Sequence, residues 1–242
     1  MRKIDLNKEK IYENSKQFSP DVRSAQSKFY WANEPNIFLH DNLTFELINN
    51  KDVLEIGCSS GTNAAIYIKS CVSYTGIDIS DEAINIANSK FKQNEVTFFC
   101  SDAHILSFRA NTFDCVIVNS LLHHMDLAVV LKEIHRVLKT DGLLIFREPL
   151  GTNVLFNLYR FLTPSARTVD EMPLNFSDLK IIDKHFIPVR VEYFGFLSIL
   201  SAFFKSHRLR SILINMDLLL SKTPIKFFFW QISGVLRKKN NF

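Results

Sequence analysis

Residues 52–61 read DVLEIGCSSG, and this stretch decides the fold. DVLEIG is a short apolar run of the kind that forms a buried strand, and Gly57 and Gly61 follow it closely. The chain has only 7 glycines in 242 residues, so this concentration marks a turn with special backbone demands. The turn lacks the G-x-G-x-x-G spacing of a dinucleotide site and the Lys-Ser/Thr of a P-loop, which argues against NAD and against P-loop chemistry.

Strands and helices alternate on the C-terminal side of this turn. A helix is expected over about 61–70, followed by a strand in VSYTGIDIS, a helix in DEAINIANSKF with Ser80 as candidate N-cap, and a strand in EVTFFCS. FDCVIVNS, DLAVVLKEIHRVLK and DGLLIFRE continue as strand, helix and strand. Such alternation predicts an α/β fold with a doubly wound, mainly parallel sheet and helices on both faces.

The flanking regions are expected to complete a single domain over 1–242. Residues 1–50 look helical, with Pro20 and Pro35 each near a helix start, and they precede the alternating region at 51–149. Residues 150–242 add two strands, HFIPVRVEYFGF and IKFFFWQISGVLR, for a total of seven. Two helical segments joined at KSHR lie between them as a cap.

Asp78 ends the second strand, twenty-one residues after Gly57. A carboxylate in this place can accept hydrogen bonds from both ribose hydroxyls of a nucleoside, or it can simply cap the following helix. Because ligands of open α/β sheets bind beyond the carboxyl ends of the strands, an adenosine-bearing ligand without a pyrophosphate fits the pattern best.

Four stretches in this order resemble the class I S-adenosylmethionine-dependent methyltransferases of the small-molecule "methyltransferase domain" type. They are VLEIGCSSGTNA, YTGIDISDEAINIA, CSDAHILSFRANTFDCVIVNSLLHHM and LKEIHRVLKTDGLLIFREP, and they cover about residues 51–149. The resemblance implies a Rossmann-like fold and S-adenosyl-L-methionine as cofactor, with S-adenosyl-L-homocysteine as product and no metal. Ser59 departs from the family, which usually has glycine there.

The resemblance also implies roles for individual residues. It puts Glu55, Gly57 and Gly61 around the methionine part, Asp78 on the ribose, Asp102 and Ala103 by the adenine, and Asn119 beside the sulfonium. Together with their neighbours, the expected cofactor-binding residues are Glu55, Gly57, Cys58, Ser59, Gly61, Asp78, Ile79, Asp102, Ala103, Asn119, Ser120 and His124.

Three candidate catalytic residues follow the fourth and fifth strands. His123 and His124 stand where a base would face the donor methyl group, and imidazole has a suitable pKa, although a cofactor-shell, capping or orienting role fits the same position. Glu148 ends the fifth strand and points toward the same rim, or anchors the turn before Pro149.

The resemblance implies that residues 1–50 form an N-terminal helical lid over the cofactor-binding core at 51–149, and that the helices between the last two strands form a substrate cap. The acceptor site is expected between the lid and the cap. Tyr30 and Trp31 cover the donor methyl group or pack helix onto sheet, and Tyr159, Arg160 and Arg167 bind an acceptor carboxylate or phosphate or form an internal Arg–Glu network. Phe194, Phe196, Phe203 and Phe204 line an apolar acceptor pocket or belong to the core.

Methyl transfer to oxygen of a small, largely apolar, natural-product-like acceptor is the leading functional hypothesis. The acceptor atom would belong to a hydroxyl or a carboxylate, including a peptide carboxylate. The alternatives are C- or N-methylation of a small or lipid-linked molecule, and a non-catalytic cofactor-binding partner subunit.

Composition limits the partners. The net charge of +4 is mild and unclustered, so no nucleic acid is expected, and no metal-ligand spacing is evident. The four separated cysteines suit a reducing cytoplasm. No stretch is long enough to span a membrane, although FGFLSILSAFF and the RKK at 237–239 allow weak contact with a membrane surface. The oligomeric state stays open.

Overall fold

Seven strands form one sheet in the computed structural model, which describes residues 27–153 and 172–240 together with Asn7, Lys10, Ile11, Asn14, Asn157 and Phe161. The order across the sheet is β3-β2-β1-β4-β5-β7-β6. β1 to β5 are mutually parallel, and β7 runs antiparallel to both of its neighbours. The strands are β1 Asp52–Ile56, β2 Ser73–Asp78, β3 Val96–Cys100, β4 Phe113–Asn119, β5 Leu138–Pro149, β6 Phe186–Phe194 and β7 Gln231–Lys238.

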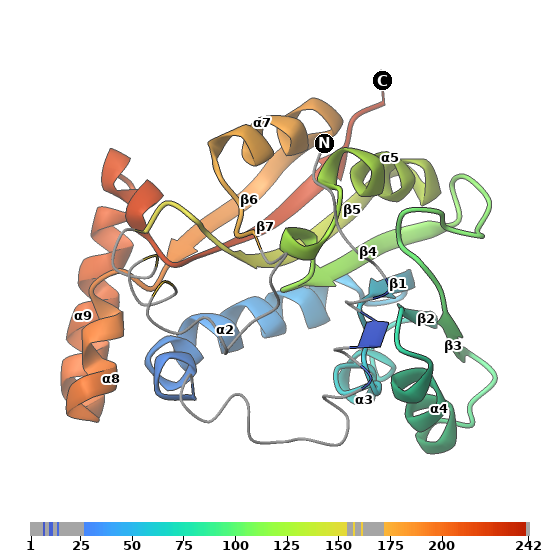
Figure 1. Ribbon diagram of the computed structural model, residues 1–242, viewed down its shortest axis with the longest axis horizontal. Helices are drawn as coiled ribbons and strands as arrows, with labels where there is room; N and C mark the ends of the chain where they lie inside the picture. The colour runs from blue at the N-terminus through green and yellow to red at the C-terminus, as the bar shows by residue number, and fades with distance from the viewer. Residues whose placement is uncertain are drawn as a thin grey trace.

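Helices cover both faces of the sheet (Figure 1). One face packs against α5 (Leu127–Val137) and α7 (Phe176–His185), and the other against α3 (Ala64–Tyr67) and α4 (Asp81–Lys90). Val116, Ile117 and Val118 of β4 are fully buried because this central strand is covered on both sides. The predicted doubly wound α/β fold with seven strands is therefore confirmed.

α2 (Ser27–Leu47) lies where the N-terminal lid was expected. Its C-terminal part packs Leu43 and Leu47 against one face of the sheet, and its N-terminal part contacts the cap. Pro35 lies inside this helix, so the prediction that it marks a helix start was wrong. A proline leaves the carbonyl four residues earlier without its donor, and here the Arg210 guanidinium donates to the Trp31 carbonyl at 2.8 Å.

The cap lies between β6 and β7 in sequence. It consists of η4 (Ser198–Leu200), α8 (Ser201–Phe204), α9 (His207–Leu220) and η5 (Pro224–Phe228), with α8 and α9 meeting at Lys205 and Ser206 as predicted. The last strand begins later than expected, because Pro224 starts the short 3-10 helix η5. Figure 1 places this cap beyond one end of the sheet.

α7 had no counterpart in the sequence prediction. Asn175 caps it, accepting hydrogen bonds from the N–H groups of Ser177 and Asp178, while Asp178 accepts one from the N–H of Asn175. The sequence NFSD carries this capping-box signal, in which an aspartate replaces the usual Glu or Gln.

Candidate active site

The turn after β1 has an unusual backbone at three positions. Gly57 and Gly61 have φ values of 80° and 75°, and Ser59 has 48°. The N–H groups of Gly57 and Cys58 both donate to the Ile77 carbonyl, at 2.8 and 3.0 Å, which anchors the turn to β2. The backbone conformation at Gly57 favours glycine, and a Cβ there would lie 2.5 Å from Leu121 Cδ2 and displace that side chain.

Asp78 presents its carboxylate beside this turn. Oδ2 accepts a hydrogen bond from the Ser59 N–H at 2.9 Å, and Oδ1 accepts one from the Ser80 N–H at 2.9 Å. The N-cap of α4 is Ser80, whose hydroxyl oxygen accepts from the Ala83 N–H, so Asp78 is not needed as the cap. Since each carboxylate oxygen can accept more than one hydrogen bond, the fixed group suits the two hydroxyls of a ribose.

Glu55 lies beneath the turn and is fully buried. Asn63 Nδ2 donates to Oε1 at 2.7 Å, and the Tyr74 hydroxyl donates to Oε2. Burial raises the pKa of Glu55 to about 7, against the two donors, which lower it. The carboxylate thus ties β1, β2 and the start of α3 together under the expected methionine site.

Asp102 and Ala103 follow β3, which flanks β2 on the side away from β1. Ala103 is buried in the core, and Asp102 Oδ1 accepts hydrogen bonds from the backbone N–H of His104, at 2.9 Å, and from its Nδ1, at 2.6 Å. His104 Nε2 in turn accepts from the Asp126 N–H at 3.1 Å. This arrangement fixes the ring's tautomer and holds the loop after β3 against the N-cap of α5.

A polar group of side chains lies at the ends of β4 and β5. Asn119 is adjacent to Arg147 in the sheet and lies beside both His40 of α2 and Tyr67 of α3. Arg147 Nη1 is 3.4 Å from Asp41 Oδ1. Burial, with a smaller effect of Arg147, lowers the pKa of His40 to about 4, so this ring is neutral at pH 7.

Two buried atoms in this group fit a polar ligand. Among the described residues, Asn119 Oδ1 and His40 Nε2 complete no hydrogen bond of good geometry. Such atoms are costly unless something pairs with them, and a zwitterionic amino-acid moiety would do so. The residues present therefore fit the methionine end of S-adenosylmethionine. Sequence reasoning missed His40 and Asp41, although the polar residues Asn33, Asn36, His40 and Thr44 follow a helical spacing on α2.

His123 and Glu148 form a buried pair. His123 Nδ1 lies 2.6 Å from Glu148 Oε2, and Glu148 Oε1 accepts the N–H groups of Leu121 and Leu122, each at 2.8 Å. The side chain of Glu148 has no exposed surface. Glu148 thus anchors η2 (Leu122–His124) to the end of β5 and orients the His123 ring at the same time.

The remaining expected cofactor residues surround this rim. The His124 ring lies 4.1 Å from the His123 ring, Ser120 has a φ of 55° and donates its N–H to the Arg147 carbonyl, and Ile79 follows Asp78. The Cys58 side chain is buried against Gly76, so only its backbone belongs to the turn.

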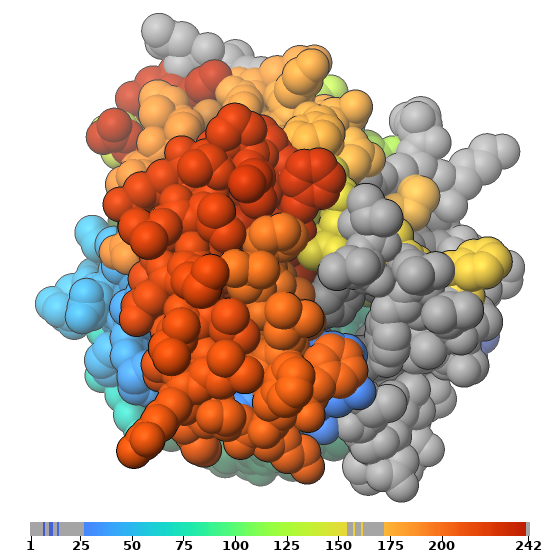
Figure 2. Space-filling view, turned by 90° about the vertical axis from the view of Figure 1, so that its left-hand side faces the viewer, coloured from blue at the N-terminus to red at the C-terminus, as the bar shows by residue number. Residues whose placement is uncertain are grey.

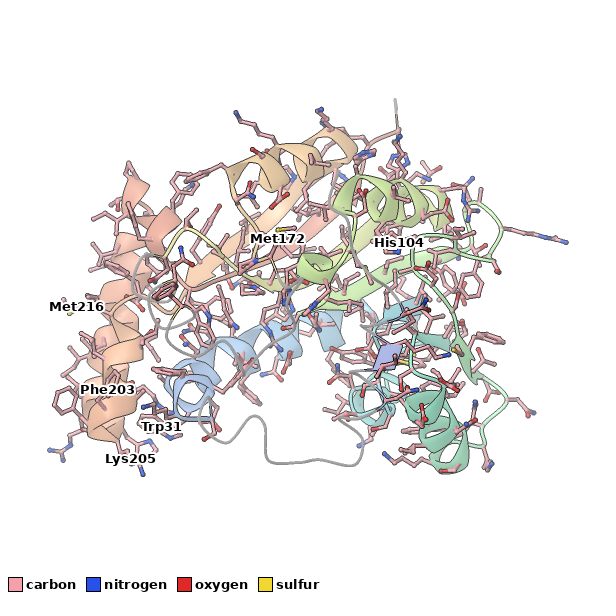
Figure 3. All side chains as sticks on the ribbon, viewed as in Figure 1. Trp31, His104, Met172, Phe203, Lys205 and Met216 are labelled. Atoms are coloured by element: carbon pink, nitrogen blue, oxygen red, sulfur yellow. The ribbon has the colours of Figure 1, made fainter. Side chains whose placement is uncertain are left out.

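The expected lid and cap residues contact one another. Tyr30 contacts Trp230, with ring centroids 5.6 Å apart, and Trp31 packs against Arg210 and His207 of α9. Figure 3 shows Trp31 at the cap end of the molecule, well away from His104. Phe194 is buried and Phe196 stacks on Phe229.

Phe203 and Phe204 are 61% and 68% exposed, so they do not line an enclosed pocket. Tyr159, Arg160 and Arg167 lie outside the described residues. Within the described parts of the chain, no group of three His, Cys, Asp or Glu side chains could hold a metal ion. No helix of those parts has the length and apolar character to cross a membrane.

Known proteins match both the sequence and the fold. Residues 54–146 match the family described as "Methyltransferase domain". The ubiquinone biosynthesis O-methyltransferase of Coxiella burnetii is 26% identical over 168 residues, which cover 60% of this chain and 72% of that protein.

Two solved structures share the fold. The MccD protein superposes with a TM-score of 0.61 and 20% identity, covering 85% of this chain and 98% of that one. The geranyl diphosphate C-methyltransferase of Streptomyces coelicolor A3(2), solved with S-adenosyl-L-homocysteine, gives 0.63 and 12%, covering 84% and 79%. The glycine turn, the strand order and the family match agree: residues 54–146 match a methyltransferase domain, and the chain has the fold of the class I S-adenosylmethionine-dependent methyltransferases.

Proposed function

We propose that this protein transfers the methyl group of S-adenosylmethionine to a hydroxyl oxygen of a small, largely apolar acceptor. The observation that favours a hydroxyl over a carboxylate is the buried His123–Glu148 pair, because a hydroxyl must lose a proton when it is methylated and a carboxylate need not. The likeness to a ubiquinone biosynthesis O-methyltransferase also supports oxygen.

S-adenosylmethionine supplies a methyl group activated by the positive charge on sulfur. Asp78 would accept the ribose hydroxyls, and the backbone of the turn at 57–61 would hold the methionine part, with His40, Asn119 and Arg147 around its charged groups. Asp102 and Ala103 would border the adenine. Ser120 and His124 would flank the reacting centre.

Glu148 gives His123 the tautomer that a general base needs. Its carboxylate accepts from Nδ1–H, so Nε2 is the nitrogen that can take a proton. In the proposed role Nε2 would accept the proton that the acceptor hydroxyl loses, and S-adenosylmethionine would supply the methyl group that the oxygen receives. Glu148 stabilises the resulting imidazolium until the proton passes to solvent.

The cofactor assignment is tested by calorimetry with S-adenosylhomocysteine. Asp78→Asn should weaken binding at least tenfold, because a neutral amide replaces one acceptor by a donor. Asp81→Asn, on an exposed site three residues further along, is the matched control and should bind like the parent protein. Equal affinity of the Asp78→Asn and parent proteins would overturn the assignment.

The chemistry is tested with an isotopically labelled methyl group and a panel of phenolic acceptors. His123→Gln should lower kcat on the order of 10²- to 10⁴-fold while leaving the S-adenosylhomocysteine affinity unchanged. Glu148→Gln should lower kcat and alter the pH profile. Label found on carbon or nitrogen would replace oxygen as the acceptor atom, and tight binding without transfer to any acceptor would favour a non-catalytic partner subunit.

The state of the cysteines bears on where in the cell the protein acts. All four cysteines are free of disulfides, and Cys58 and Cys115 are buried among apolar side chains. Thiols in this state support a reducing cytoplasm as the place of action.

A further inference from the structure

The positive charge of the protein is concentrated in the cap. Residues 195–230 contain five Lys or Arg residues and one acidic residue, Asp217, which accounts for the whole net charge of +4. Outside this segment the chain carries 24 basic and 24 acidic residues. The cap is therefore a basic end on an otherwise balanced molecule.

α9 carries an exposed apolar stripe between two cations. Ile212, Met216 and Leu219 are 58%, 44% and 69% exposed and follow one another at spacings of four and three, which places them on one side of the helix. Arg208 precedes the stripe by four residues, and Lys222 follows it by three. Both of these cations are exposed.

α8 extends this surface with a pair of aromatic residues. Phe203 and Phe204 are more than half exposed, and Lys205 follows them at the end of the helix. Figure 3 shows Phe203 and Met216 projecting from the same edge of the molecule, and Figure 2 shows α8, α9 and η5 together on one face. We call the exposed side chains of Phe203, Phe204, Ile212, Met216 and Leu219 the apolar face.

Asp217 anchors α9 to the start of the cap, and its carboxylate is buried, so its negative charge does not lie on the surface. Its side chain lies on a different side of the helix from the stripe and is 2% exposed. The carboxylate accepts hydrogen bonds from the backbone N–H groups of residues 196–198, at 3.0, 2.7 and 3.1 Å, and from the Ser198 hydroxyl at 2.7 Å. The acid of the cap thus faces inward, and the apolar face carries no negative charge of its own.

The cations near the apolar face differ in their partners. Arg210 is 3.1 Å from Glu34 of α2 and stacks on Trp31, so its charge is used within the protein. Among the described residues, no ion pair involves Lys205, Arg208 or Lys222. These three border the apolar face and are available to an external anion.

We propose that the apolar face and its three cations bind the surface of an anionic lipid bilayer. Exposed Phe, Leu, Ile and Met side chains enter the boundary between headgroups and acyl chains, while Lys and Arg contact the anionic headgroups. Self-association through this face would bring like charges together, which disfavours a second copy as the occupant. The proposal concerns a different surface from the methyl-transfer site and does not depend on the acceptor.

The RKK sequence plays no part in this surface. Lys238 donates to the Leu138 carbonyl and Lys239 to the Asp183 carbonyl, at the end of the molecule away from the cap (Figure 1). Within FGFLSILSAFF only Leu200, Phe203 and Phe204 are exposed among the large apolar residues. The surface is therefore narrower than the sequence suggested, and it is extended by α9.

Co-sedimentation with vesicles tests the proposal. The protein should pellet with vesicles of phosphatidylcholine and phosphatidylserine, pellet far less with pure phosphatidylcholine, and be released by added salt. Each Lys or Arg near an anionic surface strengthens partitioning about fivefold, so Lys205→Gln/Arg208→Gln/Lys222→Gln should weaken it on the order of a hundredfold. The matched control makes the same charge change on other surfaces, with Lys69→Gln/Lys132→Gln/Lys180→Gln. This control should bind the vesicles more tightly than the cap variant.

A second pair of variants tests the apolar contribution. Phe204→Gln/Ile212→Gln/Leu219→Gln should lose binding, whereas Ile66→Gln/Val72→Gln/Val189→Gln, which alters equally exposed apolar residues elsewhere, should keep it. Equal loss in both cation variants, or no pelleting at all, would overturn the proposal. So would a dimer in sedimentation velocity that the Phe204→Gln variant disperses, because the face would then be an interface between copies. None of these readouts uses methyl transfer, so each outcome is separate from the fate of the proposed function.

Discussion

Ser59 shows how a single residue can be under backbone strain at a binding loop. It adopts a left-handed conformation with φ of 48°, between two glycines that are also left-handed. A side chain in this region costs roughly 1–2 kcal/mol, and a glycine would avoid most of that cost. The Ser59 N–H still reaches Asp78, so the strain is accepted for a loop geometry that the site needs.

We expect Ser59→Gly to stabilise the protein. The free energy gained by relieving the left-handed strain exceeds the entropic cost of a more flexible unfolded chain. The unfolding free energy should therefore rise by about 0.5–1 kcal/mol, or roughly 1–4 °C in Tm. Thermal unfolding measures it. Ser60→Gly, next to it but without a left-handed backbone, should be neutral or destabilising, and a Tm rise as large in this control would contradict the explanation.

Glu55 should make stability depend on pH. Its pKa is about 7 in the folded protein against about 4.5 when unfolded, so its contribution is complete below pH 4.5 and is lost as the pH rises to 7. Glu55→Gln, which can still meet Asn63 and Tyr74, should gain stability relative to the parent over this range, by up to about 3 kcal/mol. Denaturant unfolding at several pH values measures this, and a difference that stays constant with pH would refute it.

Asp217 is a matching case at the scale of an element, since its carboxylate joins α9 to the backbone of residues 196–198 at the start of the cap. In the parent protein both oxygens of the Asp217 carboxylate accept hydrogen bonds from three backbone N–H groups. Asp217→Asn replaces one of these oxygens by an NH₂ group, which cannot accept them. We expect a loss of about 3 kcal/mol in unfolding free energy, and faster proteolysis within 196–222. Asn215→Asp, on the exposed side of the same helix, is the control, and equal proteolysis of both variants would count against this role.

The elements differ in how far the sequence could predict them. The central strands were predictable because short runs rich in apolar and β-branched residues, such as FDCVIVNS, are typical of a strand buried on both faces. The helix expected over about 61–70 shrinks to α3, Ala64–Tyr67, because turns on either side take up the flanking residues. Pro35 within α2 could not be foreseen, because its tolerance depends on Arg210, a residue of the distant cap.

The candidate site divides in the same way. Asp78 and the glycine turn were predictable because their chemistry lies within one short stretch and its spacing. The group around His40, Asn119 and Arg147 draws on three separate elements, so only the fold brings it together. The partnership of His123 with Glu148 likewise depends on the neighbouring ends of β4 and β5.

For the whole molecule, cofactor binding should raise thermal stability. The proposed site joins α2, which contacts the cap, to the ends of β1, β2 and β4, so a ligand held there stabilises the folded state as a unit. S-adenosylhomocysteine at about one hundred times its Kd should add about 2.7 kcal/mol, or roughly 5–10 °C in Tm. Asp78→Asn, with binding weakened at least tenfold, should lose about half of this shift or more at the same concentration, and an undiminished shift would argue against the site.

The position of β7 affects the order in which the sheet can be assembled during synthesis. β7 is the last strand to be made, yet it lies between β5 and β6 and pairs with both. When a nascent chain has reached β6, its sheet partner β7 has not yet been made. β6 therefore cannot join the sheet, and the edge of β5 stays unpaired. β1 to β5 can assemble as the chain emerges, whereas β6 and the cap that follows it must wait for β7.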